Sequence, residues 1–234
     1  MNYKTDRIIN YKSECSINEQ LKKHYQEYLV LAVLKLLYPN KFKNAVLSER
    51  PDIQCGELGV EVTVADNYDD MQAYSEFNKY CRGDNPERRK CTIEKNGKYA
   101  IRESDHGKAL ISGGGVNTEN FTETIRTKID KKTKSIGKYP NNTITRIELA
   151  ILEEELIPSD YYAALKGCVI SALKGNDTIK TVYFISSTCC LTINAETGQI
   201  DENTFAKDCI HALKVIAKMT VENKLSLNDE EWAD

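Results

Sequence analysis

Apolar residues recur along the chain with two different periods. After a Ser16–Glu19 capping box, the apolar positions from Ile17 follow the spacing of an amphipathic helix, which predicts a long helix that ends near Pro39. Residues 45–65 then predict two short strands and a stronger third strand, the segment VEVTVA, with a glycine-containing turn before it. The first third of the chain therefore reads as a helix followed by a small antiparallel sheet.

The second half of the chain alternates between helical and strand patterns. A basic helix is predicted over Thr118–Lys138, followed by a strand, a helix and two further strands. A last helix is predicted over Asn203–Met219. Because helices and strands alternate without an internal repeat, we expect an α/β fold with a central mixed β-sheet flanked by helices.

Residues 81–117 have the weakest core pattern. The Asn96-Gly97 pair lies between alternating residues and predicts a β-hairpin, and a glycine-rich loop follows it. We therefore expect a single domain over residues 1–234 with an inserted hairpin and mobile loop at about 81–117. The basic residues of this insertion are numerous enough to contact a nucleic-acid duplex, although loops of mixed charge are usually only solvated.

The composition is that of an ordinary globular protein, with 41% hydrophobic and 29% charged residues and a net charge of −3. The longest apolar run, residues 28–38, is interrupted by Lys35 and is shorter than the roughly 18 to 20 residues of a membrane span. The first residues lack the apolar region of a secretion signal, so a cytoplasmic location is expected. The cysteines form no C-x-x-C pair, which favours reduced thiols over a zinc site.

Two acids lie in unusual places. Asp52 follows Pro51, and Glu61 interrupts an apolar, β-branched strand whose other face is formed by valines. If the two segments form a hairpin, the two carboxylates face each other, which is the arrangement that Mg²⁺ or Mn²⁺ binds. The alternatives are that Asp52 is a turn residue and that Glu61 lies on a solvated strand face.

The pair Pro51-Asp52, followed by Glu61-Val62-Thr63 in an apolar strand after a long helix, resembles the motif of the PD-(D/E)XK nuclease superfamily. The resemblance covers roughly residues 17–65 by motif and 118–195 by element order, and it implies a restriction endonuclease-like core. It also implies a metal-dependent endonuclease that uses Mg²⁺ or Mn²⁺, with DNA as the expected substrate. A bacterial defence or restriction setting fits this resemblance, as does a homodimer, because cutting both strands needs two sites.

The lysine of the motif is replaced by Thr63 in this chain. In similar proteins that lysine can move to a following helix, and the basic helix described above is the candidate. At roughly 100° per residue, Lys132 and Lys128 flank the isoleucine stripe of this helix and are the expected catalytic lysines, with Lys131 third. The other lysines form a solvated face by default, and phosphate binding is their natural use if they have one.

The resemblance also implies a further metal ligand from the first helix, and Glu27 is the candidate because the turns after it are apolar. Asp52 and Glu61 would then bind the metal together with Glu27.

The replacement of the lysine by Thr63 leaves a second function open. In that alternative the domain keeps the fold, has lost catalysis, and binds nucleic acid or a protein partner. A third alternative, an immunity or structural protein without a nucleic-acid role, would be favoured if the basic helix were buried or paired with acids. Dependence on a divalent metal distinguishes the active nuclease from the binding module that has lost catalysis.

Overall fold

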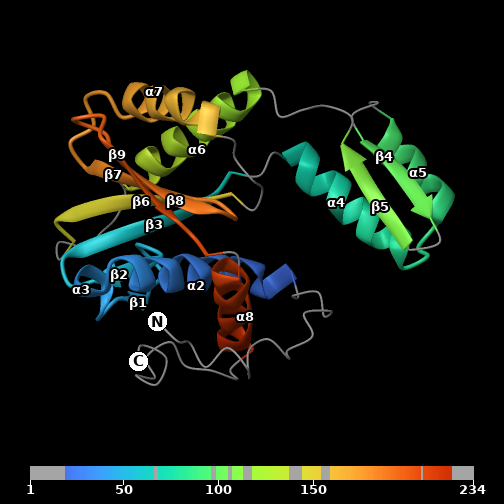
Figure 1. Ribbon diagram of the computed structural model, residues 1–234, viewed down its shortest axis with the longest axis horizontal. Helices are drawn as coiled ribbons and strands as arrows, with labels where there is room; N and C mark the ends of the chain where they lie inside the picture. Colours follow the sequence, from blue (N-terminus) through green and yellow to red (C-terminus); the bar gives the residue numbers. More distant parts are fainter. Residues whose placement is uncertain are drawn as a thin grey trace. The chain divides into compact units, whose positions relative to one another are not determined.

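The computed structural model describes residues 19–65, 68–95, 99–104, 107–112, 118–136, 144–153, 159–206 and 208–222 (Figure 1). The chain divides into two compact units. The first comprises Met1–Val64 and Arg126–Asp234, and the second comprises Ala65–Ile125. The second unit is therefore inserted within the first, and it begins earlier and ends later than the predicted insertion.

The first unit is built on a seven-stranded sheet of order β1-β2-β3-β6-β7-β8-β9. Its strands are β1 (Val46–Leu47), β2 (Ile53–Cys55), β3 (Leu58–Val64), β6 (Arg146–Leu152), β7 (Ile179–Ile185), β8 (Cys189–Asn194) and β9 (Ile200–Thr204). The three central strands β3, β6 and β7 run parallel, and the outer neighbours pair antiparallel. The predicted mixed central sheet is confirmed.

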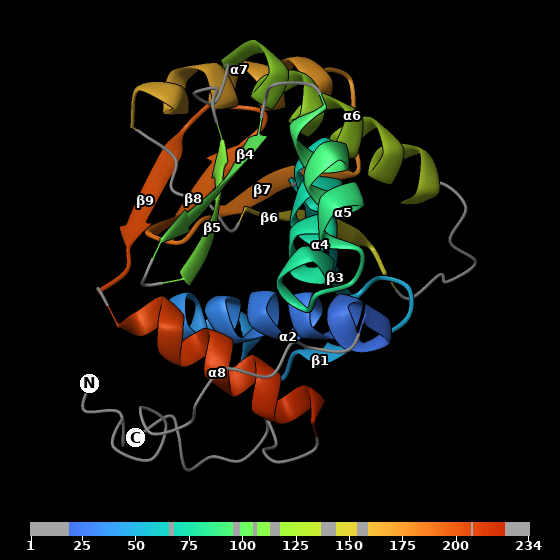
Figure 2. The ribbon, with the colours of Figure 1, turned by 90° about the vertical axis from the view of Figure 1, so that its right-hand side faces the viewer.

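Helices cover both faces of this sheet (Figure 1). On one face lie α2 (Glu19–Leu37), α3 (Pro39–Phe42) and α8 (Cys209–Val221), with α8 packed on α2 (Figure 2). On the other face lie α6 (Thr118–Ile136) and α7 (Tyr162–Ala172), the latter preceded by the 3₁₀ turn η1 (Ser159–Tyr161). The predicted flanking helices are thus present, and the first unit contains α6 from Arg126 onward.

The main core lies between α2 and the sheet. Residues 29–34 of α2 are at most 2% exposed and pack against Val60 and Val62 of β3 and Ala150 and Leu152 of β6. Because side chains alternate across a strand, the intervening residues of β3 point to the opposite face, where α6 and α7 lie. Glu61 is one of these intervening residues.

The second unit combines two helices with a two-stranded sheet. Its elements are α4 (Tyr68–Cys81), α5 (Pro86–Glu94), β4 (Tyr99–Ser104) and β5 (Gly107–Ser112). Its own small core consists of Ala73, Tyr80, Ile93, Tyr99 and Ile101.

The predicted hairpin around Asn96-Gly97 is wrong. Residues 91–94, expected as its first strand, belong to α5, and the hairpin is formed later by β4 and β5. Pro86 at the first helical position favours a helix start, and Ile93 completes the core of the unit. Asn96 and Gly97 themselves lie outside the described residues.

The start of the last helix was also predicted wrongly. Asn203 and Thr204 belong to the strand β9, and α8 begins at Cys209. The segment IDENT is polar and pairs with β8 through its backbone at the edge of the sheet, so no apolar pattern marks it. The basic helix was predicted to end at Lys138, which lies outside the described residues. The described part of this helix, α6, ends at Ile136. In the described part of the chain, no helix combines the length and apolar character that a membrane span requires.

Candidate active site

Asp52 and Glu61 come together because β2 and β3 form a hairpin. Asp52 lies immediately before β2, and Glu61 lies in the middle of β3. The Val62 backbone N–H donates a hydrogen bond of 2.8 Å to Asp52 Oδ2, so the main chain of β3 holds the aspartate in place. Asp52 is 4% exposed and Glu61 is 2% exposed. Glu61 therefore does not lie on a solvated face of the strand.

A glycine in β3 makes room for the Pro51-Asp52 pair. A Cβ atom at Gly59 would lie 2.4 Å from Pro51 Cγ and 3.0 Å from Pro51 Cβ. The proline ring is rigid and cannot turn away, so a larger residue at position 59 requires the backbone to shift. Gly59 therefore allows the aspartate to lie directly against β3.

The third member of the site comes from α6. Lys132 Nζ donates to Asp52 Oδ2 at 3.0 Å and to Glu61 Oε2 at 2.6 Å. The isoleucines Ile125 and Ile129 of the same helix are fully buried, and this orientation of α6 turns Lys132 toward β3. The lysine side chain is 22% exposed, against 5% and 3% for the two acids, so the site is reached from the lysine side.

Of the three predicted lysines, the structure brings Lys132 to the carboxylates. Lys128 lies one turn earlier and is half-buried, and Lys131 is exposed. Within the described ranges, neither of them forms an ion pair. The predicted pairing of Asp52, Glu61 and a lysine from the following helix is therefore present in the structure, and its catalytic role stays a prediction.

Glu27 lies in α2 and is 4% exposed, with Oε2 3.4 Å from His24 Nδ1. The same helix packs against the valines of β3, on the face opposite to that of Glu61. A role for Glu27 as a metal ligand stays a prediction.

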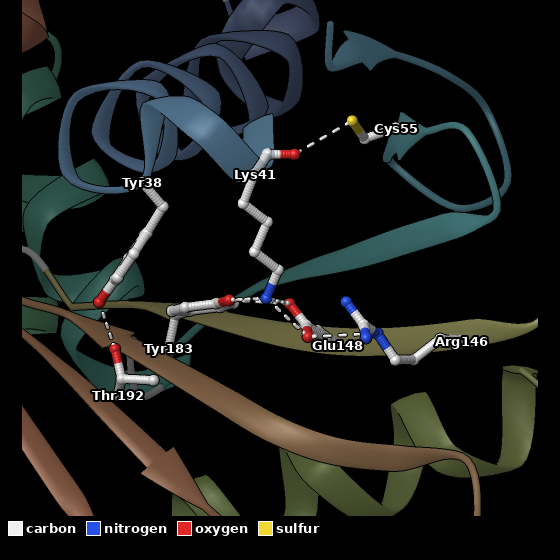
Figure 3. Close-up of polar contacts among 7 residues, drawn as sticks. All are labelled: Tyr38, Lys41, Cys55, Arg146, Glu148, Tyr183 and Thr192. Atoms are coloured by element: carbon white, nitrogen blue, oxygen red, sulfur yellow. Dashed lines mark hydrogen bonds and ion pairs between the residues drawn. The ribbon is translucent and has the colours of Figure 1, made fainter. Parts of the chain in front are cut away.

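A second buried acid, Glu148, was missed by the sequence analysis (Figure 3). It pairs with Val60 in the sheet and points to the face covered by α2 and α3. Lys41 Nζ donates to both of its carboxylate oxygens, at 2.8 and 2.7 Å, and the Tyr183 hydroxyl donates to Oε2 at 2.8 Å. Arg146 Nε lies 3.6 Å from Oε1. The signal was available, because Glu148 interrupts an apolar strand just as Glu61 does.

The Glu148 cluster anchors α3 to the sheet. Lys41 Nζ also donates to the Tyr183 hydroxyl at 2.6 Å and lies 5.4 Å from the centroid of its ring. Burial, reinforced by the Glu148 carboxylate, raises the pKa of Tyr183 well above its usual range, so the hydroxyl keeps its proton as a donor. Next to it, Tyr38 is hydrogen-bonded to Thr192 at 2.5 Å. Because the carboxylate is fully hydrogen-bonded, we assign the Glu148 cluster a structural role.

The donor set of the Asp52 site fits a hard divalent metal. In the part of the chain that the structure describes, no three residues among His, Cys, Asp and Glu gather as a closed metal cage. Mg²⁺ does not need one, because one or two carboxylates together with waters and substrate phosphates hold it. Asp52 and Glu61 supply two such carboxylates, and both lie within 3.0 Å of one ammonium group. A single cation thus reaches both acids.

The chain was compared with known protein families, curated proteins and solved structures. No family model, no curated protein and no solved structure matches the chain.

Proposed function

We propose that the chain is a metal-dependent nuclease of the PD-(D/E)XK class that hydrolyses phosphodiester bonds, with DNA as the substrate. The observation that carries this proposal is the convergence of two buried carboxylates, Asp52 and Glu61, on the ammonium group of Lys132. Buried like charges are costly unless they are compensated, so two buried acids that meet one ammonium group mark a candidate functional site.

The element order supports the same class. A long helix is followed by a hairpin that carries both acids, and the helix that carries Lys132 comes immediately before β6, which runs parallel to β3. The mixed sheet flanked by helices agrees with the core that the resemblance implies. Thr63, on the same face of β3 as Glu61, occupies the position of the motif lysine, and Lys132 supplies an ammonium group from α6 instead.

Each residue has a role in the proposed reaction. Asp52 and Glu61 would hold Mg²⁺ or Mn²⁺, which when bound acts as a Lewis acid on the phosphate and lowers the pKa of a bound water. Lys132 would donate to the attacking water or to a phosphate oxygen and would offset the developing negative charge. The Val62 N–H keeps Asp52 aligned throughout.

One observation favours a second candidate function. The ammonium group of Lys132 forms ion pairs with both carboxylates. This pairing of a lysine of the basic helix with acids favours the alternative of an immunity or structural protein without a nucleic-acid role.

Cleavage assays with matched variants test the proposal. Wild-type protein is incubated with duplex DNA, single-stranded DNA and RNA in Mg²⁺, Mn²⁺ or EDTA, beside Asp52→Asn, Glu61→Gln and Lys132→Met. Lys41→Met is the control, because Lys41 also contacts a buried glutamate but on the other face of the sheet. We expect metal-dependent cutting in the wild type and the control, and a loss of about 100-fold or more in the three site variants.

Two results would contradict the nuclease. Equal loss of cutting in Lys41→Met and Lys132→Met would show that the effect is only structural. Absence of cutting by the wild type, together with no binding of Mg²⁺ or Mn²⁺ in calorimetry, would favour the binding module.

A further inference from the structure

The helix that carries Lys132 has a second group of positive charges that the site does not use. Lys128 lies three residues before Lys131 and four residues before Lys132, so its side chain is a neighbour of both on the surface of α6. Asp52 and Glu61 compensate Lys132. Among the described residues, Lys128 and Lys131 form no ion pair.

Helical geometry places this pair beside the site. Taking roughly 100° per residue, Lys128 lies about 40° from Lys132 around the helix, and Lys131 lies a further 60° toward solvent. Lys128 is about 6 Å from Lys132 along the helix axis. The burial pattern agrees, because Lys128 is half-buried and Lys131 is exposed. The positive charge therefore continues from the site to the open surface.

The residues one helical turn from Lys131 on α6 are neutral or basic. The residues three or four positions from Lys131 are Thr127, Lys128, Lys134 and Ser135. Asp130 is the acid of α6 nearest to these lysines in sequence. Its spacing of four residues makes it a neighbour of Lys134 on the helix surface. Like charges at this spacing destabilise a helix. Lys128 is therefore repelled by Lys131 and Lys132, and a bound anion would relieve this repulsion.

We propose that Lys128 and Lys131 bind the phosphate backbone of duplex DNA beside the scissile phosphate, so that α6 positions the strand while Lys132 serves the site. Lysines together with threonine and serine hydroxyls are the side chains that contact phosphate oxygens, and Thr127 is exposed next to the pair. The inference rests on the proposed function, because it is that function which makes a polyanion the substrate.

The salt dependence of binding measures the contacts directly. Binding of a short fluorescent DNA duplex is followed by anisotropy in EDTA over a series of salt concentrations, so that nothing is cut. Each lost lysine–phosphate contact lowers the slope of log K against log salt by about 0.9. We expect the slope to fall by about 2 in Lys128→Ala/Lys131→Ala.

The matched control is Lys43→Ala/Lys214→Ala, which removes the same charge from the helical layer on the opposite face of the sheet. We expect this control to keep the wild-type slope. In EDTA without DNA, Lys128→Ala/Lys131→Ala should melt at the same temperature as the wild type or higher, because like-charge repulsion is relieved. With Mg²⁺, the KM for the duplex should rise in this variant, because the lost contacts also hold the substrate.

An unchanged slope in Lys128→Ala/Lys131→Ala, or an equal fall in both double variants, would overturn the inference even if the protein cuts DNA. So would failure of the wild type to bind the duplex. A fall confined to the α6 variant supports it even if the wild type does not cut, so the inference and the proposed nuclease can fail separately.

Discussion

Replacing Lys132 with methionine removes the ammonium group and its charge and keeps an unbranched side chain that is one atom shorter. The substitution leaves Asp52 and Glu61 facing each other with 4% and 2% exposure and no ammonium between them. Removing one partner of a fully buried ion pair costs about 3 to 5 kcal/mol. Because the lysine is 22% exposed and partly solvated, we expect a loss of about 2 to 3 kcal/mol, which lowers Tm by roughly 4 to 12 °C in a protein of this size.

A divalent metal should restore this loss. In Lys132→Met the two carboxylates can bind a metal without displacing an ammonium group. The affinity for the metal should therefore be higher in this variant than in the wild type. A ligand at about 100 times its Kd stabilises the folded state by about 2.7 kcal/mol, close to the expected cost of the substitution. Thermal unfolding in EDTA, Mg²⁺ and Mn²⁺ therefore gives a larger metal-induced rise in Tm for Lys132→Met than for the wild type.

The control is Lys41→Met, which leaves Glu148 without its ammonium partner on the other face of the sheet. This variant should be destabilised too, but a metal should not restore its Tm. The reasoning is refuted if Lys132→Met is as stable as the wild type in EDTA, or if the metal raises the Tm of both methionine variants equally.

Two further predictions concern the surroundings of the sites. Gly59→Ala places a Cβ 2.4 Å from Pro51 Cγ, so we expect the free energy of unfolding to fall by about 1 to 3 kcal/mol and metal-dependent cutting to be lost. The control is Gly167→Ala, because a Cβ at this position meets nothing within 4 Å. This variant should keep both its stability and its cutting activity. The raised pKa of Tyr183 means that the unfolded chain loses this proton first as the pH rises, so its contribution to stability is complete below the ordinary pKa of 10.0 and declines above it. Tyr183→Phe should therefore show a shallower alkaline decline in urea unfolding, by up to about 1.4 kcal/mol per pH unit, and an identical decline would contradict the assignment.

Several features of the fold and the site followed from local sequence. The long first helix, the strong strand around Glu61 and the strands of the second half are each encoded by apolar periodicity within a single segment. The acids Asp52 and Glu61 were also recognisable, because a charged residue in an apolar strand is conspicuous wherever that strand lies. The polar strand β9 and the helix α5 were not, since neither has an apolar pattern that distinguishes it from its surroundings.

The partners of the buried charges were decided by tertiary structure. Helical periodicity did not decide which of Lys128, Lys131 and Lys132 reaches the acids. The packing of α6 on the sheet brings Lys132 to Asp52 and Glu61, which are 80 and 71 positions away in the sequence. Lys41 and Glu148 meet across 107 positions. A local pattern specifies which side of an element is apolar, but the angle and register at which two elements pack depend on all the side chains between them. The sequence by itself thus determined the acids and the kind of element that carries each residue, and packing determined which cation compensates them.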